Sequence, residues 1–378
     1  MASQSRNQPD KTVTDRVVIT GIGTVTSLGC SQWSTALALR FRKSSWCEHE
    51  TVLVADDPYG AVLRGATISR IPEEIISPEL DGAERAEALF HPALKECMAG
   101  LSIAEQKRLV CRIDNFIDYE QHLFPSLLQE AFPGLSLEHG QKPIELGRCS
   151  LFERIIQAGG ELLAGNAERI LVGCVDSLCA TSWLMSVCDE DVLKDSLTPE
   201  GIIAGEAAGA VLLEREAAAR RRNAPVLAIL SSWGRGTEPN LWHGPIPSTG
   251  RGLTDAFLEA ISPHGDGGKG VVTVIADLNG DRHRALDWAY TEGRIFIDGD
   301  REPELRHPAF IAGDCGKATG ALLLADALGR FAFHPGFRGT LALSTSDESG
   351  ARRVICLEHG DHEERKGFIE QLRAQLAG

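Results

Sequence analysis

The distribution of apolar and polar positions along the chain predicts an alternation of helices and short strands. Apolar residues recur every three or four positions in segments that we predict as helices, namely Ser31–Arg42, Glu84–Leu101, Phe116–Phe132 and Ser150–Ala164. Short apolar runs bounded by turn residues predict strands at Arg108–Ile113, Arg169–Gly173, Val226–Leu230 and Val271–Ala276. Helices and strands that alternate in this way are typical of an α/β protein.

A helix followed by two strands is predicted once in each half of the chain. The helix Ser150–Ala164 is followed by the strand Arg169–Gly173 and, after a run punctuated by glycines, by a second apolar strand that ends at Glu214. In the C-terminal half, a small-residue helix at Gly316–Leu328 is followed by strands at Thr340–Leu343 and Arg353–Leu357. The shared order of helix, strand and strand indicates an internal duplication.

The same pattern divides the chain into segments. We predict that residues 1–14, which are polar and contain no apolar signal region, form a disordered leader. The basic segment Arg215–Arg222 is followed by Asn223-Ala-Pro225, which breaks the pattern, so we expect two halves at 15–222 and 223–360. We expect residues 361–378 to form an amphipathic terminal helix that packs on the body; the alternative is a helix that binds a partner.

Composition and charge exclude several kinds of partner. The chain has 378 residues and a formal net charge of −15, which argues against binding to nucleic acid or to an anionic membrane surface. Its longest nearly apolar run, Gly201–Leu213, contains Glu206 and is too short to span a membrane as a helix. We therefore expect neither nucleic acid nor a membrane among the partners.

No pattern in the chain points to a metal or a cofactor. The ten cysteines have no Cys-x-x-Cys and no zinc-finger spacing, so we predict reduced thiols in a cytoplasmic protein. Gly21-x-Gly23 lacks the third glycine of a dinucleotide-binding fingerprint. Asp277, Asn279 and Asp281 are spaced as in a calcium loop, but Trp288 stands at the position of the bidentate carboxylate.

Three segments together resemble a known family. They are the opening Asp15–Gly29, in which a strand runs into a glycine turn, the segment Ser150–Gly173, and the motif Gly205-Glu206-x-x-Gly209 before a strand. Read together they resemble the core of the β-ketoacyl synthases of the thiolase superfamily. This resemblance, over about 15–357, implies a thiolase fold, layered αβαβα and built from two pseudo-repeated halves. It also implies a two-fold dimer formed through the strand after the nucleophile helix.

The resemblance implies that the usual catalytic groups have been replaced. β-Ketoacyl synthases condense a thioester-bound acyl chain with malonyl on an acyl carrier protein, and they use one cysteine and two histidines. In this chain those positions fall on Arg148, Asp277 and Lys317. A cation at a helix N-terminus is unfavourable by up to about 1 kcal/mol, and an ionised carboxylate would repel the developing oxyanion. The family's glycine-rich gate is represented by Asp347-Glu-Ser-Gly350, and Ala312 stands near the position of a family lysine.

Cys149 is the alternative nucleophile. It follows Arg148 by one residue, a rotation of about 100° around a helix, which would turn its thiol away from the pocket. We interpret Cys149 as a core or cap cysteine, and keep a catalytic role for it as the second interpretation.

Two functions follow from these positions. The first is a non-catalytic partner, scaffold or adaptor, as a homodimer or as a heterodimer with a thiolase-fold partner, binding a client protein or an acyl carrier protein; the family resemblance includes proteins that accompany bacterial secretion effectors. The second is a divergent acyltransferase, a 3-oxoacyl synthase in which Cys149 is the nucleophile. An acidic carrier would need a basic patch, for which Arg215 and Arg220–Arg222 are candidates, although a solvated helix end is the simpler interpretation.

Overall fold

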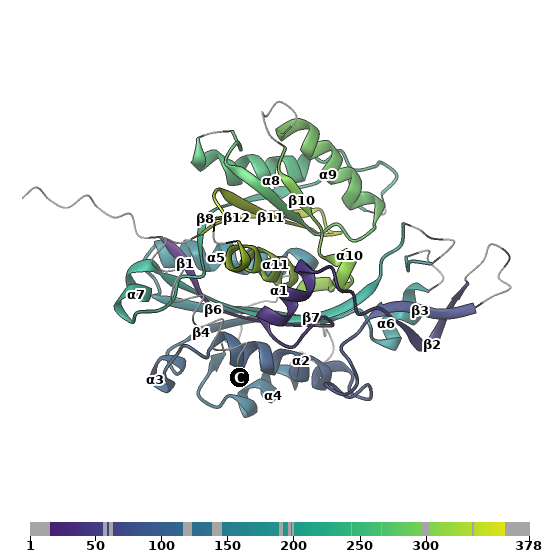
Figure 1. Cartoon of the computed structure of the whole chain (residues 1–378), viewed down its shortest axis with the longest axis horizontal. Helices are drawn as coiled ribbons and strands as arrows, with labels where there is room; N and C mark the ends of the chain where they lie inside the picture. The colour runs from purple at the N-terminus through teal and green to yellow at the C-terminus, as the bar shows by residue number, and fades with distance from the viewer. Residues whose placement is uncertain are drawn as a thin grey trace, which may run out of the picture.

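The computed structural model describes residues 16–55, 59, 63–115, 123–137, 146–188, 192–195, 198, 200–242, 244–265, 267–296, 302–334 and 336–359. Within them the elements stack in five layers, with helices between two parts of a sheet and outside both (Figure 1). This arrangement confirms the predicted layered α/β fold. The predicted leader at 1–14 and the terminal helix at 361–378 lie outside the described residues.

The N-terminal half builds the lower part of the sheet in Figure 1, with the strand order β5-β4-β6-β7-β1. The bounds are Val17–Thr26 for β1, Val110–Asn115 for β4, Ser136–Leu137 for β5, Arg169–Ser177 for β6 and Ala204–Arg215 for β7. A hairpin of β2 (Cys47–Ala55) and β3 (Leu63–Ser69) joins this part because β3 pairs with the start of β7. The outer layer consists of α2 (Gly82–Cys97), α3 (Ile103–Gln106) and α4 (Leu123–Ala131).

The C-terminal half builds the upper part, with the order β10-β9-β11-β12-β8. The bounds are Ala228–Thr237 for β8, Val271–Ala276 for β9, Glu304–Arg306 for β10, Thr340–Ser346 for β11 and Ala351–Glu358 for β12. Helices α8 (Arg251–Ile261) and α9 (Arg282–Ile295) cover its outer face (Figure 1). β8 pairs with β1, which joins the two halves into one sheet. The shorter elements are α6 (Thr181–Val187), α7 (Glu216–Arg221), η2 (Ser262–His264) and α10 (Ala309–Ala312).

The two halves repeat one topology, as the sequence predicted. When the hairpin of β2 and β3 is left out, the five strands of each half lie side by side in the order third, second, fourth, fifth and first, numbered along the chain. The fourth and fifth strands are antiparallel, β6 with β7 and β11 with β12, and the second and fourth are parallel, β4 with β6 and β9 with β11. The helix before the fourth strand begins with a 3-10 turn in both halves, which are η1 (Gly147–Cys149) before α5 (Ser150–Leu163) and η3 (Gly316–Ala318) before α11 (Thr319–Phe333).

The middle layer holds these two repeated helices together with α1 (Gln32–Arg40). Because α11 is enclosed between the two parts of the sheet, its residues are small or apolar around most of its circumference and nearly all of them are buried. Gly209 of β7 permits this packing, since a Cβ atom there would lie 2.2 Å from the Cβ of Ala321. Glu206 of the same motif is buried and forms an ion pair of 2.6 Å with Arg85. The motif that carried the family resemblance is therefore a packing motif.

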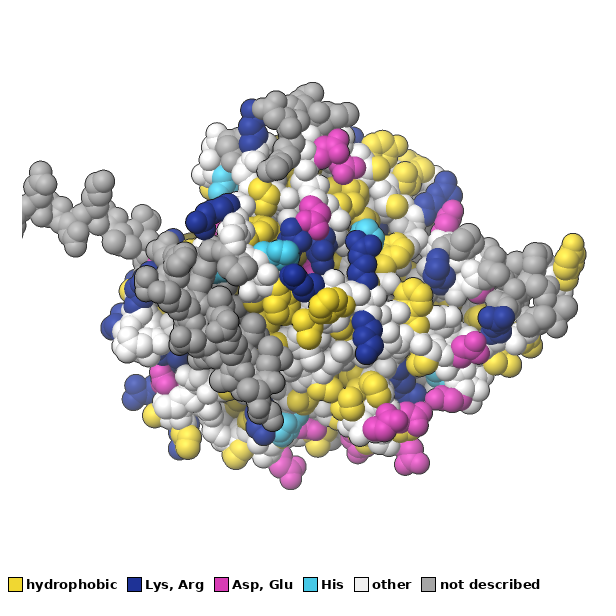
Figure 2. Space-filling model, viewed as in Figure 1, with side chains coloured by type: hydrophobic (Ala, Val, Ile, Leu, Met, Phe, Trp, Pro, Cys, Tyr) yellow, Lys and Arg dark blue, Asp and Glu magenta, His cyan; other side chains and the backbone are white. Residues whose placement is uncertain are grey.

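The face shown in Figure 2 combines charged and apolar side chains. Lys, Arg and His side chains gather at its centre, where α1 lies in front of the middle layer (Figures 1 and 2). Acidic side chains are more frequent along its lower edge (Figure 2).

One expectation was wrong in detail. We expected a dimer to form through the strand after the helix at 150–164, but this strand, β6, pairs with β4 on one side and β7 on the other. It has no free edge at which a partner could pair. The charged segment Asp281–Arg284 is not wholly exposed: Asp281 is the N-cap of α9, and Arg284 is buried with 2% of its surface exposed.

Candidate functional site

The heads of α5 and α11 meet at the centre of the molecule. The turns η1 and η3 that open the two helices contact each other, and they carry Arg148 and Lys317. The end of β9 brings Asp277 to the same region, because β9 lies beside β11 and the hairpin turn after β11 reaches η1. The structure thus brings together the three positions that the sequence analysis selected.

Arg148 is held by two carboxylates. Its Nη2 lies 2.7 Å from Oδ2 of Asp314 and its Nε lies 3.2 Å from Oδ1, so the contact is bidentate. Its Nη1 donates to Glu348 at 2.8 Å. The side chain of Arg148 is 12% exposed and that of Asp314 only 2%. Burial opposes ionisation of Asp314, but the adjacent Arg148 guanidinium outweighs it and holds the pKa of that carboxyl well below its usual range.

Asp314 is the residue around which this site is organised. Its carboxylate accepts hydrogen bonds from Nδ2 of Asn279 at 2.6 Å and from the backbone N of Gly316 at 2.9 Å, in addition to the ion pair with Arg148. The sequence analysis missed Asp314. It lies in a loop between α10 and η3, and no periodicity or motif separates it from other loop carboxylates.

Asp277 is paired as well. Its Oδ2 accepts from the backbone N of Ser346 at 2.7 Å and from Nε of Arg284 at 3.2 Å. Burial raises the pKa of Asp277, and the positive charge of Arg284 partly opposes that rise. The indole of Trp242 covers the Arg284 guanidinium, with 4.2 Å between the guanidinium carbon and the ring centre. The imidazole of His283 stacks on the indole of Trp242, with 4.9 Å between the two ring centres.

Lys317 contacts the site through its backbone N–H. Its N–H donates to Oδ2 of Asp176 at 2.7 Å, and its side chain is half-buried. Asp176 is the last residue but one of β6 and is buried. Burial raises its pKa to about 6, against the opposing effects of the Lys317 N–H and of the Lys317 and Arg148 charges. The carboxylates of Asp176, Asp277, Asp314 and Glu348 therefore lie around the heads of the two central helices, which carry Arg148 and Lys317.

Cys149 points out of this cluster. Its Sγ donates to the backbone oxygens of Thr345 at 3.3 Å and of Ala351 at 3.4 Å, on the side of β11 and β12. The residue has no exposed surface, and burial raises the pKa of its thiol to about 12. A thiol in this environment stays protonated near neutral pH and is not a nucleophile.

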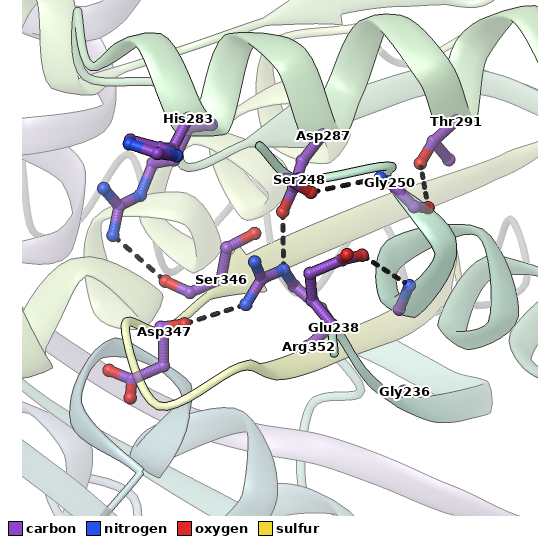
Figure 3. A network of polar contacts seen from close by, with 12 residues as sticks. Gly236, Glu238, Ser248, Gly250, His283, Asp287, Thr291, Ser346, Asp347 and Arg352 are labelled. Atoms are coloured by element: carbon purple, nitrogen blue, oxygen red, sulfur yellow. Dashed lines mark hydrogen bonds and ion pairs between the residues drawn. The ribbon is translucent and has the colours of Figure 1, made fainter. Parts of the chain in front are cut away.

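The wall of the site on the C-terminal half is a hydrogen-bonded network (Figure 3). Arg352 of β12 forms an ion pair of 2.6 Å with Asp287 of α9 and donates to the backbone oxygen of Asp347 at 2.8 Å. Asp287 also accepts from Ser248, and the carboxylate of Glu238 accepts from the backbone N of Gly252 at 3.0 Å. These bonds attach the segment 238–252 and the hairpin turn to α9, which fixes the wall beside Asp277.

The turn that stands in place of the family's glycine-rich gate is bonded to η1. The carboxylate of Asp347 accepts from the backbone N of Arg148 at 3.1 Å and from the backbone N of Ser349 at 2.9 Å. Gly147, with a φ of +45°, permits this approach, since a Cβ there would lie 1.8 Å from Oδ2 of Asp347. The turn therefore binds Arg148 at two places: Asp347 accepts from the backbone N–H of Arg148, and Glu348 accepts from its guanidinium.

Over the residues that the structure describes, no group of three or more His, Cys, Asp or Glu side chains is placed to hold a metal ion. A search of the same residues for a helix long and apolar enough to cross a membrane finds none.

Comparisons with known proteins find likeness in structure and not in sequence. No protein-family model and no curated protein matches the chain. Solved ketosynthases do match. One is AntDE:AntF, a type II PKS acyl-carrier protein in complex with its ketosynthase bound to the hexaketide, with a TM-score of 0.74, 14% identity and coverage of 92% of this chain and 100% of that one. The chain has the ketosynthase fold. This finding confirms the resemblance to the thiolase superfamily at the level of the fold.

Two further solved structures that contain ketosynthases are similar to this chain. The ishigamide ketosynthase/chain length factor matches with a TM-score of 0.70 and 16% identity, over 92% of this chain and 100% of that chain. The ketosynthase from module 6 of the bacillaene synthase of Bacillus subtilis 168 matches with a TM-score of 0.73 and 13% identity, over 92% of this chain and 72% of that chain. At such identity the likeness establishes the fold, and the chemistry must be argued from the side chains.

Proposed function

We propose that this chain is a ketosynthase-fold protein without condensing activity, and that it acts as a non-catalytic partner, scaffold or adaptor of another protein. The ion pair between Arg148 and Asp314 is the observation that carries the proposal. It occupies the head of the helix at which the resemblance expects a cysteine thiolate. A guanidinium has no electron pair to attack a thioester, so covalent loading of an acyl group at this position is chemically impossible.

The other positions support the same conclusion. Condensation requires hydrogen-bond donors aimed at a developing oxyanion. Asp277 offers a carboxylate that accepts from Ser346 and Arg284, and the Lys317 backbone is bonded to Asp176. Arg148 and Asp277 are thus engaged in buried pairs with groups of the chain itself, and disruption of either pair would leave a buried charge without a partner.

The alternative acyltransferase would depend on Cys149. That thiol has no exposed surface and is hydrogen-bonded to the backbone of β11 and β12, on the side away from Asp314. Before it could attack a thioester, the hairpin of these strands would have to open. Its burial therefore favours the non-catalytic function.

The comparisons support a protein partner in general terms. One similar structure is named a ketosynthase/chain length factor, and another is a complex of a ketosynthase with an acyl-carrier protein. We propose a homodimer, or a heterodimer with a second thiolase-fold chain, and a client such as a secretion effector or a carrier protein. All ten cysteines are free thiols, which supports a reducing, cytoplasmic location.

The experiment that tests the proposal is intact-mass spectrometry after incubation with acetyl-, malonyl- and longer acyl-thioesters. A ketosynthase with an intact catalytic cysteine verifies each donor, and the Cys149→Ala variant is run beside the wild-type chain. We expect no mass gain on either form of this chain. A gain that is lost in Cys149→Ala would overturn the proposal in favour of the acyltransferase. Native mass spectrometry of the chain purified from its own cell extract then tests the partner, and a chain that always purifies alone would contradict that part.

A further inference from the structure

Two adjoining hollows lie on the face shown in Figure 2, between α1, β10 and α11. The first has a volume of about 380 Å³ and is lined by Arg42, Trp46, residues 304–308 and Phe310. The second, of about 260 Å³, is lined by Arg40, Arg330 and His334. Arg306 and Asp326 line both hollows, so the two form one continuous depression, which we name the α1–β10 groove.

The groove carries positive charge that the described residues do not neutralise. Arg306 is paired with Asp326 at 2.6 Å, and Arg330 is paired with Glu304. Neither Arg40 nor Arg42 has a carboxylate partner in the part of the chain that the structure describes; Arg40 lies 3.1 Å from Nε2 of His334. This excess is notable in a chain whose net charge is −15. It is a local positive field of the kind that attracts an anionic partner.

The basic helix end that the sequence analysis considered for an acidic carrier differs in this respect. Arg220 is paired with Glu216 at 2.6 Å, Arg221 with Glu168 at 2.5 Å, and Arg222 with Glu214. These arginines are already engaged with carboxylates of the chain itself. Among the described residues, the arginines of the α1–β10 groove are therefore better placed than those of this helix end to pair with an acidic partner.

The positive charge of the groove also lowers the pKa of two histidines that line it, His307 and His334. Burial lowers the pKa of His307, and the charges of Arg42 and Arg306 lower it further. Burial and the charges of Arg40 and Arg330 likewise lower the pKa of His334. A carboxylate bound in the groove would oppose these effects.

The groove also exposes apolar surface. Trp46 is 46% exposed and Phe310 is 44% exposed, although both line the larger hollow. The indole of Trp46 is fixed in place because its Nε1 donates to the backbone oxygen of Ile311 at 3.1 Å. Phe41, the C-cap residue directly after α1, is 72% exposed. Exposed aromatic side chains gathered in one place mark an interaction site.

The backbone beside the hollow offers a third kind of contact. β10 is the last strand of the sheet, and within the described residues it pairs with β9 alone. All residues from 304 to 308 line the hollow, so the groove runs along this strand. An edge strand of this kind accepts an extended peptide as an additional strand, with main-chain hydrogen bonds for affinity and side-chain pockets for specificity.

We propose that the α1–β10 groove binds an extended acidic segment of a partner protein. The segment lies along β10, its carboxylates pair with Arg40 and Arg42, and a large apolar side chain enters the hollow between Trp46 and Phe310. The groove shares no lining residue with the site around Arg148. The inference therefore stands whether or not the chain retains catalysis, and acyl-loading experiments do not bear on it.

A library of random peptides displayed on phage, selected on the full-length chain, tests the proposal. The selection is repeated on the charge-reversed variant Arg40→Glu/Arg42→Glu. The control is Arg108→Glu/Arg251→Glu, which makes the same change of net charge at exposed positions away from the groove. We expect peptides rich in Asp and Glu with at least one aromatic or large aliphatic residue. We expect them to bind the charge-reversed variant at least about tenfold more weakly, and to bind the control as they bind the wild-type chain.

A second variant, Phe310→Ala, tests the apolar contact without changing charge, and it should also weaken binding of the selected peptides. Enrichment of no peptide, enrichment of peptides without acidic residues, or equal binding to the charge-reversed variant would each overturn the proposal. Light scattering on the same variants identifies a different occupant. If charge reversal changes the mass of the chain in solution, a second copy of the chain occupies the groove and the proposal is wrong.

Discussion

The guanidinium of Arg148 and the carboxylate of Asp314 form a buried two-point ion pair at the head of α5. Two nearly buried charges are stable in this position because they pair with each other, while Glu348 and Asn279 complete their contacts. The pair also joins the two halves of the molecule, since Arg148 belongs to the N-terminal repeat and Asp314 precedes the corresponding turn of the C-terminal repeat. The position at which the family resemblance expects chemistry is here a structural contact between the repeats.

Removal of one partner should therefore destabilise the chain strongly. Asp314→Ala leaves the Arg148 guanidinium buried without its bidentate partner, and we expect a loss of about 3–5 kcal/mol in the free energy of unfolding. Urea denaturation measures this loss. The matched control is Glu168→Ala, which removes the partner of Arg221 in a pair whose two side chains are each 60% exposed, and which should cost less than about 1 kcal/mol.

Replacement of both partners separates the charge effect from packing. The double variant Arg148→Met/Asp314→Leu removes both buried charges, so it should be more stable than Asp314→Ala alone. If Asp314→Ala costs no more than the surface control, the ion pair does not carry the stability assigned to it.

A cysteine introduced at the family's nucleophile position should be unreactive in this site. In the variant Arg148→Cys, the carboxylates of Asp314, Asp277 and Asp347 face the new thiol without the guanidinium, and nearby negative charge raises a thiol pKa. We expect slow alkylation by iodoacetamide at neutral pH. The second variant Arg148→Cys/Asp314→Asn removes one of these charges and should react faster. Rates are measured by mass spectrometry of the peptide that contains residue 148.

The exposed thiol of Cys47 serves as the internal reference for these rates. Equal rates in the two variants would mean that Asp314 does not control the electrostatics of this position. A rate at residue 148 above that of Cys47 in the single variant would show that the scaffold still activates a thiol there.

The fold could be predicted because its signals are local and repeated. The order helix, strand, strand and the glycines around Glu206 can be read directly in the chain, and each has a packing cause, such as the contact of Gly209 with Ala321. The strand pairing that excludes β6 from a dimer interface could not be predicted in this way. It depends on which strands become neighbours, and β4 and β7 are distant from each other in the sequence.

The site could be predicted only in part. The positions Arg148, Asp277 and Lys317 follow from the resemblance to the family's motifs, and the structure brings them together. Their partners do not: Asp314 lies in a loop that no motif distinguishes, and Arg284 lies in the charged segment Asp281–Arg284, which resembles a solvent-exposed surface. The burial of Arg284 could have been inferred from α9, where residues 284, 287, 288 and 291 are buried with helical spacing.

Cys149 should be protected from alkylation in the folded chain. Its thiol has no exposed surface and a pKa of about 12, so it presents neither access nor thiolate near neutral pH. We expect iodoacetamide to label Cys47 in the native chain and to label Cys149 only after unfolding by urea. Peptide mass spectrometry distinguishes the two sites. Labelling of Cys149 at a rate comparable to that of Cys47 would restore the acyltransferase alternative.

Asp176 should make the stability of the chain depend on pH in the mildly acidic range. Burial raises its pKa from 3.8 to about 6 in the folded chain, so the folded state favours the protonated carboxyl. This contribution is fully present below about pH 4 and is lost as the pH rises through about 6. A shift of roughly two units corresponds to about 3 kcal/mol.

The variant Asp176→Asn cannot ionise, so the difference in unfolding free energy between the wild-type chain and this variant should fall by about 3 kcal/mol between pH 4 and pH 7. Asn has one oxygen fewer to accept from Ser177 and Lys317, so the variant is less stable at acidic pH, and the informative quantity is the change of the difference with pH. Urea denaturation at several pH values measures it, with Asp255→Asn on the exposed face of α8 as the control for an added amide. Parallel curves for the wild-type chain and Asp176→Asn would mean that Asp176 is already ionised in the folded chain, stabilised by the Lys317 N–H and the charges of Lys317 and Arg148.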